Sequence, residues 1–540
     1  MSIEDKIREL IFNALTSLGI SFDINNITID HSKDPMHGDY ASNIAMKANK
    51  LLGPTPIESA NKIVNALNKD LFTKVEIAKP GFINFFLKAD SISNVIEEII
   101  NKDSQYGAGP INNKRINIEY VSANPTGNLH VGHARCAAYG DSLSRIMHFA
   151  GYSITREYYV NDAGNQIKNL GESIYQRYME LYGKEPVFPE GGYLGEDVKL
   201  VAKHFKEKYQ DKLKEHNDKN LEIITREGLN LELDNIKKDL KLFGVEFDVF
   251  SFETDIRKSG DIEKALKELD QYIYEDNNAK ILKTTMFLDD KDRPIIKSNG
   301  EYTYFLPDIA YHYNKLNRKF DLLIDVLGAD HHGYINRMKS ALMMKGYKKE
   351  QLEVPLIQVV RLMNNGVEVK MSKRTGNAIT LRELCEEVGV DAVRYFFVSR
   401  SNTSHLDFDF NLAKSHSNDN PVYYAQYAHA RLSNVLLLGK DITPIYTGEL
   451  LKEKIELELI KTLQEFPSIV SSVASTHEVH KLTIYINLIA TLIHSFYNEC
   501  RIVNQDDIKL SANRLGLVKA CQIVLRNALN LIGVSAPNKM

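Results

Sequence analysis

The stretch Ile116-Asn-Ile-Glu-Tyr-Val121, followed by a loop and by His130-Val-Gly-His133, decides the fold. Its first six residues have the apolar content of a short buried strand, and the helical period begins at Ala134 and runs to Met147. A strand, a loop of Asn, Pro, Thr and Gly, and then a helix form the opening of a nucleotide-binding βαβ unit. We therefore predict an α/β fold around these residues.

Further elements of the same kind follow. We predict strands at 320–326 and 356–360, with a helix at 334–344 between them. Residues 111–405 are therefore expected to form one α/β domain. Its middle, about 171–283, is rich in Lys and Glu with helical periodicity, which predicts a helical insertion on one side of the sheet.

The two ends of the chain have other patterns. Residues 1–110 predict a small α+β unit, with helices at 3–18 and from Thr55-Pro56, and with strands within 75–87 around Lys79-Pro80-Gly81. Residues 406–540 predict an all-helical bundle, whose last helix ends at Gly533.

The composition excludes several classes of protein. The 540 residues carry a net charge of −4, so no overall positive field indicates a polyanionic partner. The four cysteines are scattered and include no Cys-x-x-Cys pair, which argues against structural zinc or a disulfide framework. The N-terminus does not resemble a signal peptide, and no apolar run approaches the ~20 residues that span a bilayer. A soluble, cytoplasmic enzyme is the expectation.

His130-Val131-Gly132-His133 lies where the first loop meets its helix. Two histidines three residues apart at a helix start point the same way, and the helix N-terminus favours phosphate. Gly132 has no Cβ, so a flat adenine can approach the backbone. By itself the motif is weak evidence, because two helix-capping histidines or a metal pair are alternatives with better than even odds.

A second motif, Lys370-Met371-Ser372-Lys373-Arg374-Thr375-Gly376-Asn377, lies 240 residues later. Its alternative is a solvated charge run, the usual fate of such clusters. However, it follows an apolar strand and the turn signal Asn364-Asn365-Gly366, which indicates a basic loop held at a sheet edge.

Together the two motifs resemble the HIGH and KMSKS signatures of class I aminoacyl-tRNA synthetases. The resemblance implies a Rossmann-type catalytic domain that binds ATP with Mg²⁺. The catalytic residues would be His130, His133, Lys370 and Lys373, and the ATP site would also include Gly132 and Met371. Because an amino-acid carboxylate attacks the α-phosphorus, catalysis would consist mainly of alignment and charge neutralisation.

Several further segments are similar to the arginyl-tRNA synthetases: 119–133, 159–164, 302–310, 328–333, 427–431 and, in the N-terminal unit, 37–42 and 81–84. The resemblance implies L-arginine as substrate. The implied arginine-binding residues are Glu119, Ser122, Asn124, Tyr304, Asp308 and His331. A guanidinium favours planar, bidentate acceptors, which suits Asp308 and Glu119. The alternatives are a helix N-cap for Asp308 and a core aromatic for Tyr304.

The same resemblance implies that tRNA(Arg) binds to the N-terminal domain and to the anticodon-binding bundle, that arginine activation needs bound tRNA, and that the enzyme is a monomer. Asn84, Phe85 and Tyr427 are the predicted tRNA contacts, with helix packing as the alternative for the tyrosine. Two other functions remain to be weighed. A nucleotidylyltransferase would typically be small and lack the helical tail, and a non-catalytic paralogue would be expected to lose the motif histidines or lysines.

Overall fold

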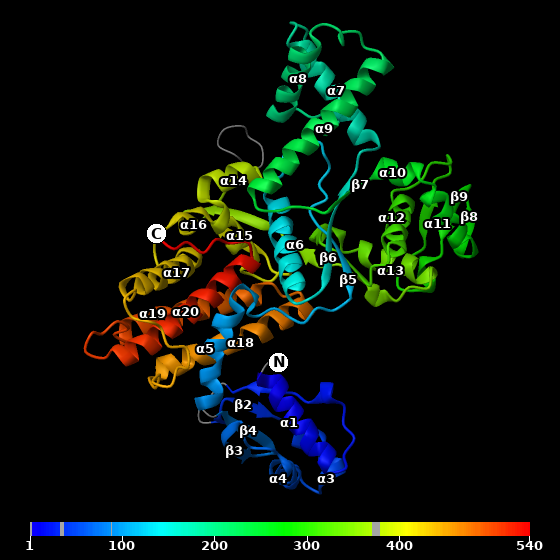
Figure 1. Ribbon diagram of the computed structural model, residues 1–540. Coiled ribbons are helices and arrows are strands. Elements are labelled where there is room, and N and C mark those ends of the chain that lie inside the picture. The colour runs from blue at the N-terminus through cyan, green and yellow to red at the C-terminus, as the bar shows by residue number, and fades with distance from the viewer. Residues whose placement is uncertain (1–2, 33–36, 88, 370–378) are drawn as a thin grey trace.

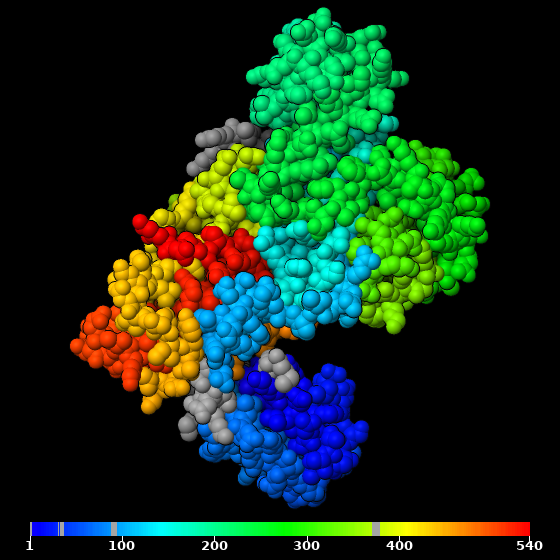
Figure 2. All heavy atoms as spheres, viewed as in Figure 1, coloured from blue at the N-terminus to red at the C-terminus, as the bar shows by residue number. Residues whose placement is uncertain are grey.

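The computed structural model describes residues 3–32, 37–87, 89–369 and 379–540 (Figure 1). Four parts can be distinguished by eye. An N-terminal unit, blue, projects at one end, and a group of helices, green, projects at the other (Figure 2). Between them lie a parallel sheet with its helices and, beside it, a C-terminal helical bundle.

The N-terminal unit packs helices on a four-stranded antiparallel sheet of order β1-β2-β4-β3. The predicted start at Thr55-Pro56 is confirmed, because the Thr55 hydroxyl accepts a hydrogen bond from the Glu58 amide at 3.3 Å. Its elements are α1 (Ile3–Ser17), β1 (Asp30–His31), β2 (Tyr40–Ser42), α2 (Ile44–Lys47), α3 (Asn49–Leu52), α4 (Pro56–Ala66), β3 (Phe72–Ala78) and β4 (Phe82–Leu87).

The central sheet has five parallel strands in the order β13-β11-β5-β6-β7. The strands are β5 (Arg115–Glu119), β6 (Ser153–Val160), β7 (Val249–Phe252), β11 (Leu322–Asp325) and β13 (Leu352–Glu353). The chain builds outward from β5 to β7 and then returns to the other side of β5. In such sheets the ligand crevice lies at the carboxyl ends of the strands where the order reverses, here between β5 and β11.

Two helices of this domain agree with the predicted periods, α6 (Val131–Phe149) and α13 (Tyr334–Met344). A third helix, α12 (Phe305–Asn317), was not predicted from its period. The single strand predicted at 356–360 is wrong. It is two strands in different small sheets: β14 (Leu356–Ile357) pairs with β12 (Leu327–Gly328), whereas β15 (Val360–Asn364) pairs with β16 (Val367–Glu368) and β17 (Leu406–Asp409). The break occurs because the Gln358 carbonyl accepts from Arg135 Nη1 at 2.7 Å and its amide donates to Asn402.

The predicted helical insertion at about 171–283 is correct only in its first part. The projecting helices are α7 (Asn165–Glu180), α8 (Glu196–Tyr209) and α9 (Asp218–Leu242), which share a small apolar core of their own. After α9 the chain forms β7, which pairs with β6 and belongs to the central sheet. Beyond it lie α10 (Glu253–Lys258), α11 (Asp261–Leu269), β8 (Ile273–Asp276), β9 (Ala279–Leu282) and β10 (Arg293–Ile296).

The chain after Asp409 is helical, as predicted, with α16 (Phe410–Lys414), α17 (Pro421–Leu438), α18 (Lys454–Thr476), α19 (His480–Glu499) and α20 (Ile508–Leu531). The helices α14 (Leu381–Val388) and α15 (Val390–Val398) precede the predicted boundary at 406, and β17 directly follows it. Gly533 follows α20 with φ +66°. The connecting helix α5 (Ala89–Lys102) packs against α18 and α20 (Figure 1). Among the described helices, none is long and apolar enough to cross a membrane.

Candidate active site

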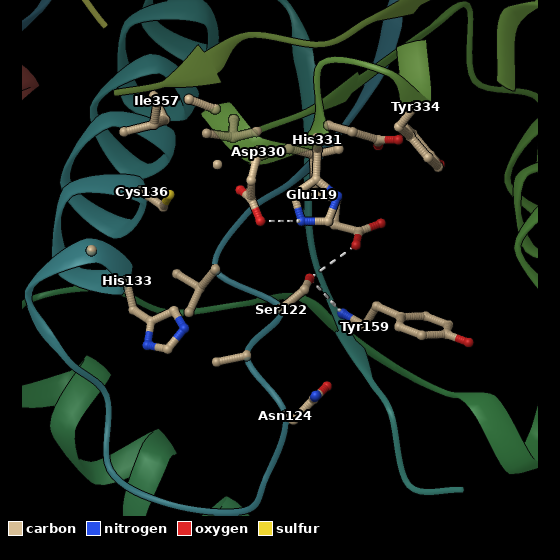
Figure 3. A pocket seen from close by; sticks show the side chains of 18 of the residues that line it. Glu119, Ser122, Asn124, His133, Cys136, Tyr159, Asp330, His331, Tyr334 and Ile357 are labelled. Carbon is tan, nitrogen blue, oxygen red and sulfur yellow. Dashed lines mark hydrogen bonds and ion pairs between the residues drawn. The ribbon is translucent and has the colours of Figure 1, made fainter. Parts of the chain in front are cut away.

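A cavity of about 820 Å³ opens at the carboxyl ends of β5 and β11, where the strand order reverses. Its size suits a small-molecule site. Figure 3 shows side chains from α6, from the loop after β5 and from the segment before α13 around one space. Nine predicted site residues line it: Glu119, Ser122, Asn124, His130, Gly132, His133, Tyr304, Asp308 and His331.

The two motif histidines cap helix α6. His130 Nδ1 accepts from the Gly132 amide at 3.1 Å, and His133 Nδ1 accepts from the His130 amide at 3.3 Å. Their rings stack with centroids 3.8 Å apart. A Cβ at Gly132 would lie 3.0 Å from His130 Cε1, so the glycine makes room for the capping ring. The helix-capping alternative is therefore correct for the Nδ1 atom of each histidine.

This capping fixes the tautomer of both histidines. Since Nδ1 is an acceptor in each ring, the proton of the neutral imidazole lies on Nε2, which remains available as a donor. Burial lowers the pKa of His130, and burial together with His130 lowers the pKa of His133 to about 4. At neutral pH the motif thus presents two uncharged N–H donors at a helix N-terminus, a suitable place for phosphate oxygens.

Lys370, Met371 and Lys373 of the second motif lie outside the described residues. The chain that follows them is described, and it joins the first motif directly. The Leu381 amide donates to the Leu129 carbonyl at 2.7 Å, and His130 forms a β-bridge with Thr380. The C-terminal flank of the basic motif is therefore fixed beside the motif histidines.

The loop after β5 is held in an unusual conformation. Val121 and Ser122 both have positive φ, 69° and 37°, and for a β-branched residue this is a strained conformation. The turn directs Ser122 Oγ to two partners: it donates to Glu119 Oε1 at 2.9 Å and accepts from the Tyr159 amide at 3.0 Å (Figure 3). Asn124 donates to Gln166 Oε1 at 2.6 Å. Strain at this position is typical of a preorganised binding site.

Helix α12 carries the predicted guanidinium site. Because α12 begins at Phe305, Asp308 lies inside its first turn, and the N-cap alternative is wrong. Tyr304 is 82% exposed, so the core alternative for it is wrong as well. His331 has a half-exposed side chain, 3.7 Å from Asp330 (Figure 3).

Three charged residues of this region were missed by the sequence reasoning. His312 and Lys315 of α12 and Asp325 of β11 are all buried beneath the cavity. A lysine in a helix is usually solvated, which is why Lys315 attracted no attention. A signal did exist, because Asp308, His312 and Lys315 are spaced i, i+4, i+7 and therefore share one helix face.

The predicted tRNA contacts have different environments. Phe85 is fully buried and packs on Phe72 with ring centroids 5.0 Å apart, so an RNA contact at Phe85 is wrong. Asn84 is only 4% exposed. Tyr427 is half-buried on α17, where it stacks between Tyr423 and His494, so the packing alternative holds for much of its ring.

No group of three or more potential metal ligands is found among the described residues. All four cysteines, Cys136, Cys385, Cys500 and Cys521, are free thiols. Burial raises the pKa of Cys136, beside the cavity, to about 12, so its thiol is protonated at neutral pH.

Comparison with known families matches nearly the whole chain. Residues 5–87 match the arginyl tRNA synthetase N terminal domain, residues 95–434 match the catalytic domain of class I tRNA synthetases (R), and residues 425–540 match the DALR anticodon binding domain.

Individual relatives agree with these matches. The chain is 48% identical to the arginine–tRNA ligase of Listeria welshimeri, with 96% of this chain and 95% of the relative covered. It is 46% identical to that of Bacillus subtilis, with 100% and 99% covered. Among solved structures, the arginyl-tRNA synthetase of Thermus thermophilus has the same fold, with a TM-score of 0.79 at 22% identity and full coverage of both chains.

Proposed function

Since the chain belongs to the arginyl-tRNA synthetase family and is an arginine–tRNA ligase, we propose that the cavity between β5 and β11 is where it joins arginine to ATP. The observation that carries this proposal is the convergence of nine predicted residues on one cavity at the reversal of the strand order. The helical C-terminal bundle argues against a nucleotidylyltransferase, and the presence of His130, His133, Lys370 and Lys373 argues against a non-catalytic paralogue.

In the proposed reaction the arginine carboxylate oxygen attacks the α-phosphorus of ATP. One O–P bond forms, and the bond to the departing pyrophosphate breaks. The Nε2–H groups of His130 and His133 donate to phosphate oxygens as negative charge moves toward the pyrophosphate. Lys370 and Lys373 are proposed to neutralise that charge, with Met371 and Gly132 beside the nucleotide. A tRNA 3′-terminal hydroxyl then attacks the arginyl carbonyl, and AMP leaves.

Arginine is proposed to lie with its side chain toward α12. Asp308 and Tyr304 would receive the guanidinium, and Asn124 would lie near the α-amino or carboxylate end. Glu119 and Ser122 would shape the floor of the pocket through their mutual hydrogen bond, with His331 at its rim.

Magnesium is proposed to enter with the triphosphate rather than to occupy a site of its own. Support for this comes from the described residues, which contain no preformed group of three ligands, and from the preference of Mg²⁺ for substrate phosphates. When bound it would neutralise phosphate charge. We also propose that the enzyme acts as a monomer in the cytoplasm, which gel filtration and cell fractionation would test.

For tRNA(Arg), we propose that Tyr427 takes part through an aromatic surface on α17. Tyr423 stacks on Tyr427 with centroids 5.8 Å apart, and Arg431 lies 4.7 Å from the Tyr427 ring centre. Aromatic faces beside a guanidinium are typical of contacts with unpaired bases. Because Asn84 is nearly as buried as Phe85, we propose that the N-terminal domain contacts the tRNA through its surface rather than through Asn84 itself.

The function is tested by incubating the protein with ATP, total tRNA and labelled arginine, and by measuring label in acid-precipitable RNA. We expect arginine to be incorporated and lysine not to be, in a parallel reaction with labelled lysine. Incorporation of lysine, or none of arginine, would overturn the assignment. A Lys373→Ala variant should form adenylate much more slowly while binding tRNA normally.

A further inference from the structure

Three carboxylates lie side by side across the central sheet. In the strand register Glu119 of β5 faces Asp325 of β11 on one side and Glu157 of β6 on the other. We call these three residues the acid row. All three are buried, with at most 8% of the residue exposed. Glu119 and Asp325 are the last residues of their strands, whereas Glu157 lies inside β6. Three adjacent buried carboxylates would repel one another strongly unless cations were close by.

Helix α12 supplies those cations. Lys315 Nζ donates to Glu119 Oε2 at 2.5 Å and to Asp325 Oδ1 at 3.0 Å, and it lies 4.5 Å from the ring centre of Tyr311. Arg318, which follows the helix, donates to both oxygens of Glu157 at 2.8 Å. Each of these hydrogen bonds is charge-assisted, and the ammonium of Lys315 is enclosed by Glu119, Asp325 and the ring of Tyr311.

The third cation is His312. Its Nε2 lies 2.7 Å from Asp325 Oδ2, and its Nδ1 lies 2.8 Å from the Asp308 carbonyl and 3.2 Å from Asp308 Oδ1. Carbonyl and carboxylate oxygens only accept, so both ring nitrogens must donate and the imidazole is protonated. Although burial opposes the charge, Asp325 and Asp308 raise the pKa of His312 to about 10.

Between α12 and the acid row the charges are therefore balanced except at one place. Three cations face the three carboxylates of the acid row, and Asp308 is left as the additional negative group there. Two further carboxylates line the cavity: Glu253 pairs with Arg257, and Asp330 lies beside His331. The side chain of Asp308 is also the accessible one, at 33% exposure against 3% for Asp325. The side chain of Glu119 is also less accessible than that of Asp308, and its two oxygens already accept hydrogen bonds from Ser122 and Lys315. Burial raises the pKa of Glu119, but the ammonium at 2.5 Å favours the carboxylate.

We propose that Lys315 and His312 are positioning residues that hold this end of the pocket at one surplus negative charge and place that charge on Asp308, where it receives the substrate guanidinium. Glu119 is then a counter-ion of Lys315 rather than a direct ligand of the arginine side chain. The inference rests on the proposed function, since it requires arginine to bind with its side chain toward α12.

The experiment changes the net charge beneath the pocket in two steps. Aminoacylation rates are measured while the concentration of either arginine or ATP is varied. Lys315→Met leaves two surplus charges, and the uncompensated acid row competes with Asp308 for His312 and for the substrate. We expect the KM for arginine to rise about tenfold, with the KM for ATP within about twofold of the wild-type value. Lys315→Met combined with Asp325→Asn restores one surplus charge and should bring the KM for arginine back to within about threefold.

Lys345→Met is the matched control. Lys345 also pairs with a carboxylate, Glu268 at 2.8 Å, and lies 4.2 Å from the ring centre of Tyr313, but it is outside the cavity. The Lys345→Met variant should leave the KM for arginine unchanged. A double variant as impaired as Lys315→Met would overturn the proposal, because the side-chain shape of Lys315 would then matter and not its charge. An unchanged KM in Lys315→Met would overturn it too.

If Lys315→Met does not fold, the same pair of substitutions is tested starting from Asp325→Asn. Asp325→Asn alone removes the surplus charge and should raise the KM for arginine, and adding Lys315→Met should lower it again. A further rise instead would contradict the proposal. The wild-type protein is measured in the same assay, so a failure to charge arginine at all would refute the function separately from the role of Lys315.

Discussion

Two buried clusters of charge in this molecule can be compared, because they serve different purposes. The first, the pocket cluster, is the acid row with His312, Lys315 and Arg318 beneath the cavity. The second, which we call the clamp, joins Asp141 of α6 to Arg394 of α15. Arg394 donates to Asp141 Oδ2 at 2.5 Å and to the carbonyls of Ile532 and Phe243, both at 3.0 Å.

The difference lies in what the cations are bound to. Arg394 is completely buried, and two of its three partners are backbone carbonyls at the ends of α9 and α20. The clamp therefore ties four helices together, and none of its residues lines the active-site cavity. In the pocket cluster the cations bind carboxylates and leave Asp308 accessible. Burial of charge stabilises the architecture in the clamp, whereas in the pocket cluster it prepares a site for a cation.

The largest effect is expected from breaking the clamp. Arg394→Met leaves Asp141 buried with only Arg145, whose side chain is 40% exposed. Removing one partner of a buried ion pair costs about 3–5 kcal/mol in the free energy of unfolding. We expect this loss in chemical denaturation, with an unchanged KM for arginine in the enzyme that remains folded. A raised KM at unchanged stability would show that the clamp also serves the site.

The next effect concerns the accessible carboxylate of the pocket cluster. Asp308→Ala should raise the KM for arginine about 10- to 100-fold, because a charge-assisted, bidentate contact is lost at a group that solvent still partly screens. The KM for ATP should change little, as should the denaturation midpoint. Steady-state kinetics with each substrate varied gives the test, and equal losses for both substrates would indicate a role in folding.

The clamp and the pocket cluster also differ in how far the sequence predicts them. The strand before Val121 and the helix that follows His130 were predicted from local patterns, whereas the convergence of His133, Ser122 and Asp308 on one site was implied by the family resemblance. The reversal of strand order was not predicted, because it depends on pairing between distant segments. The clamp could not be predicted, because Arg394 finds its partners 253 and 138 residues away, at Asp141 and Ile532.

The pocket cluster was partly predictable from the sequence. Its helix face repeats at 308, 312 and 315, but the strand acids have no local signal, since Glu157 and Glu119 are brought together only by the pairing of β6 with β5. The RNA contact at Phe85 was wrong for a related reason: Ile83, Asn84 and Phe85 of β4 are all buried, which the local sequence does not reveal.

The smallest effect is a pH dependence that only the pocket cluster should have. His312 faces Asp325 from β11, Asp308 and Lys315 from its own helix, and Tyr334 from α13, and its pKa rises from 6.5 to about 10 on folding. A raised pKa means that the folded state binds the extra proton, so its contribution is complete below pH 6.5 and is lost as the pH rises toward 10. Relative to His312→Gln, the wild-type free energy of unfolding should therefore fall by on the order of 1 kcal/mol between about pH 7 and pH 8. Denaturation curves of both proteins across that range give this difference. The control is the difference between wild type and Arg394→Met, which keeps His312, and it should not change with pH in this way. A difference that stays constant with pH would mean that His312 is neutral in the folded protein and that the acid row keeps a second surplus charge.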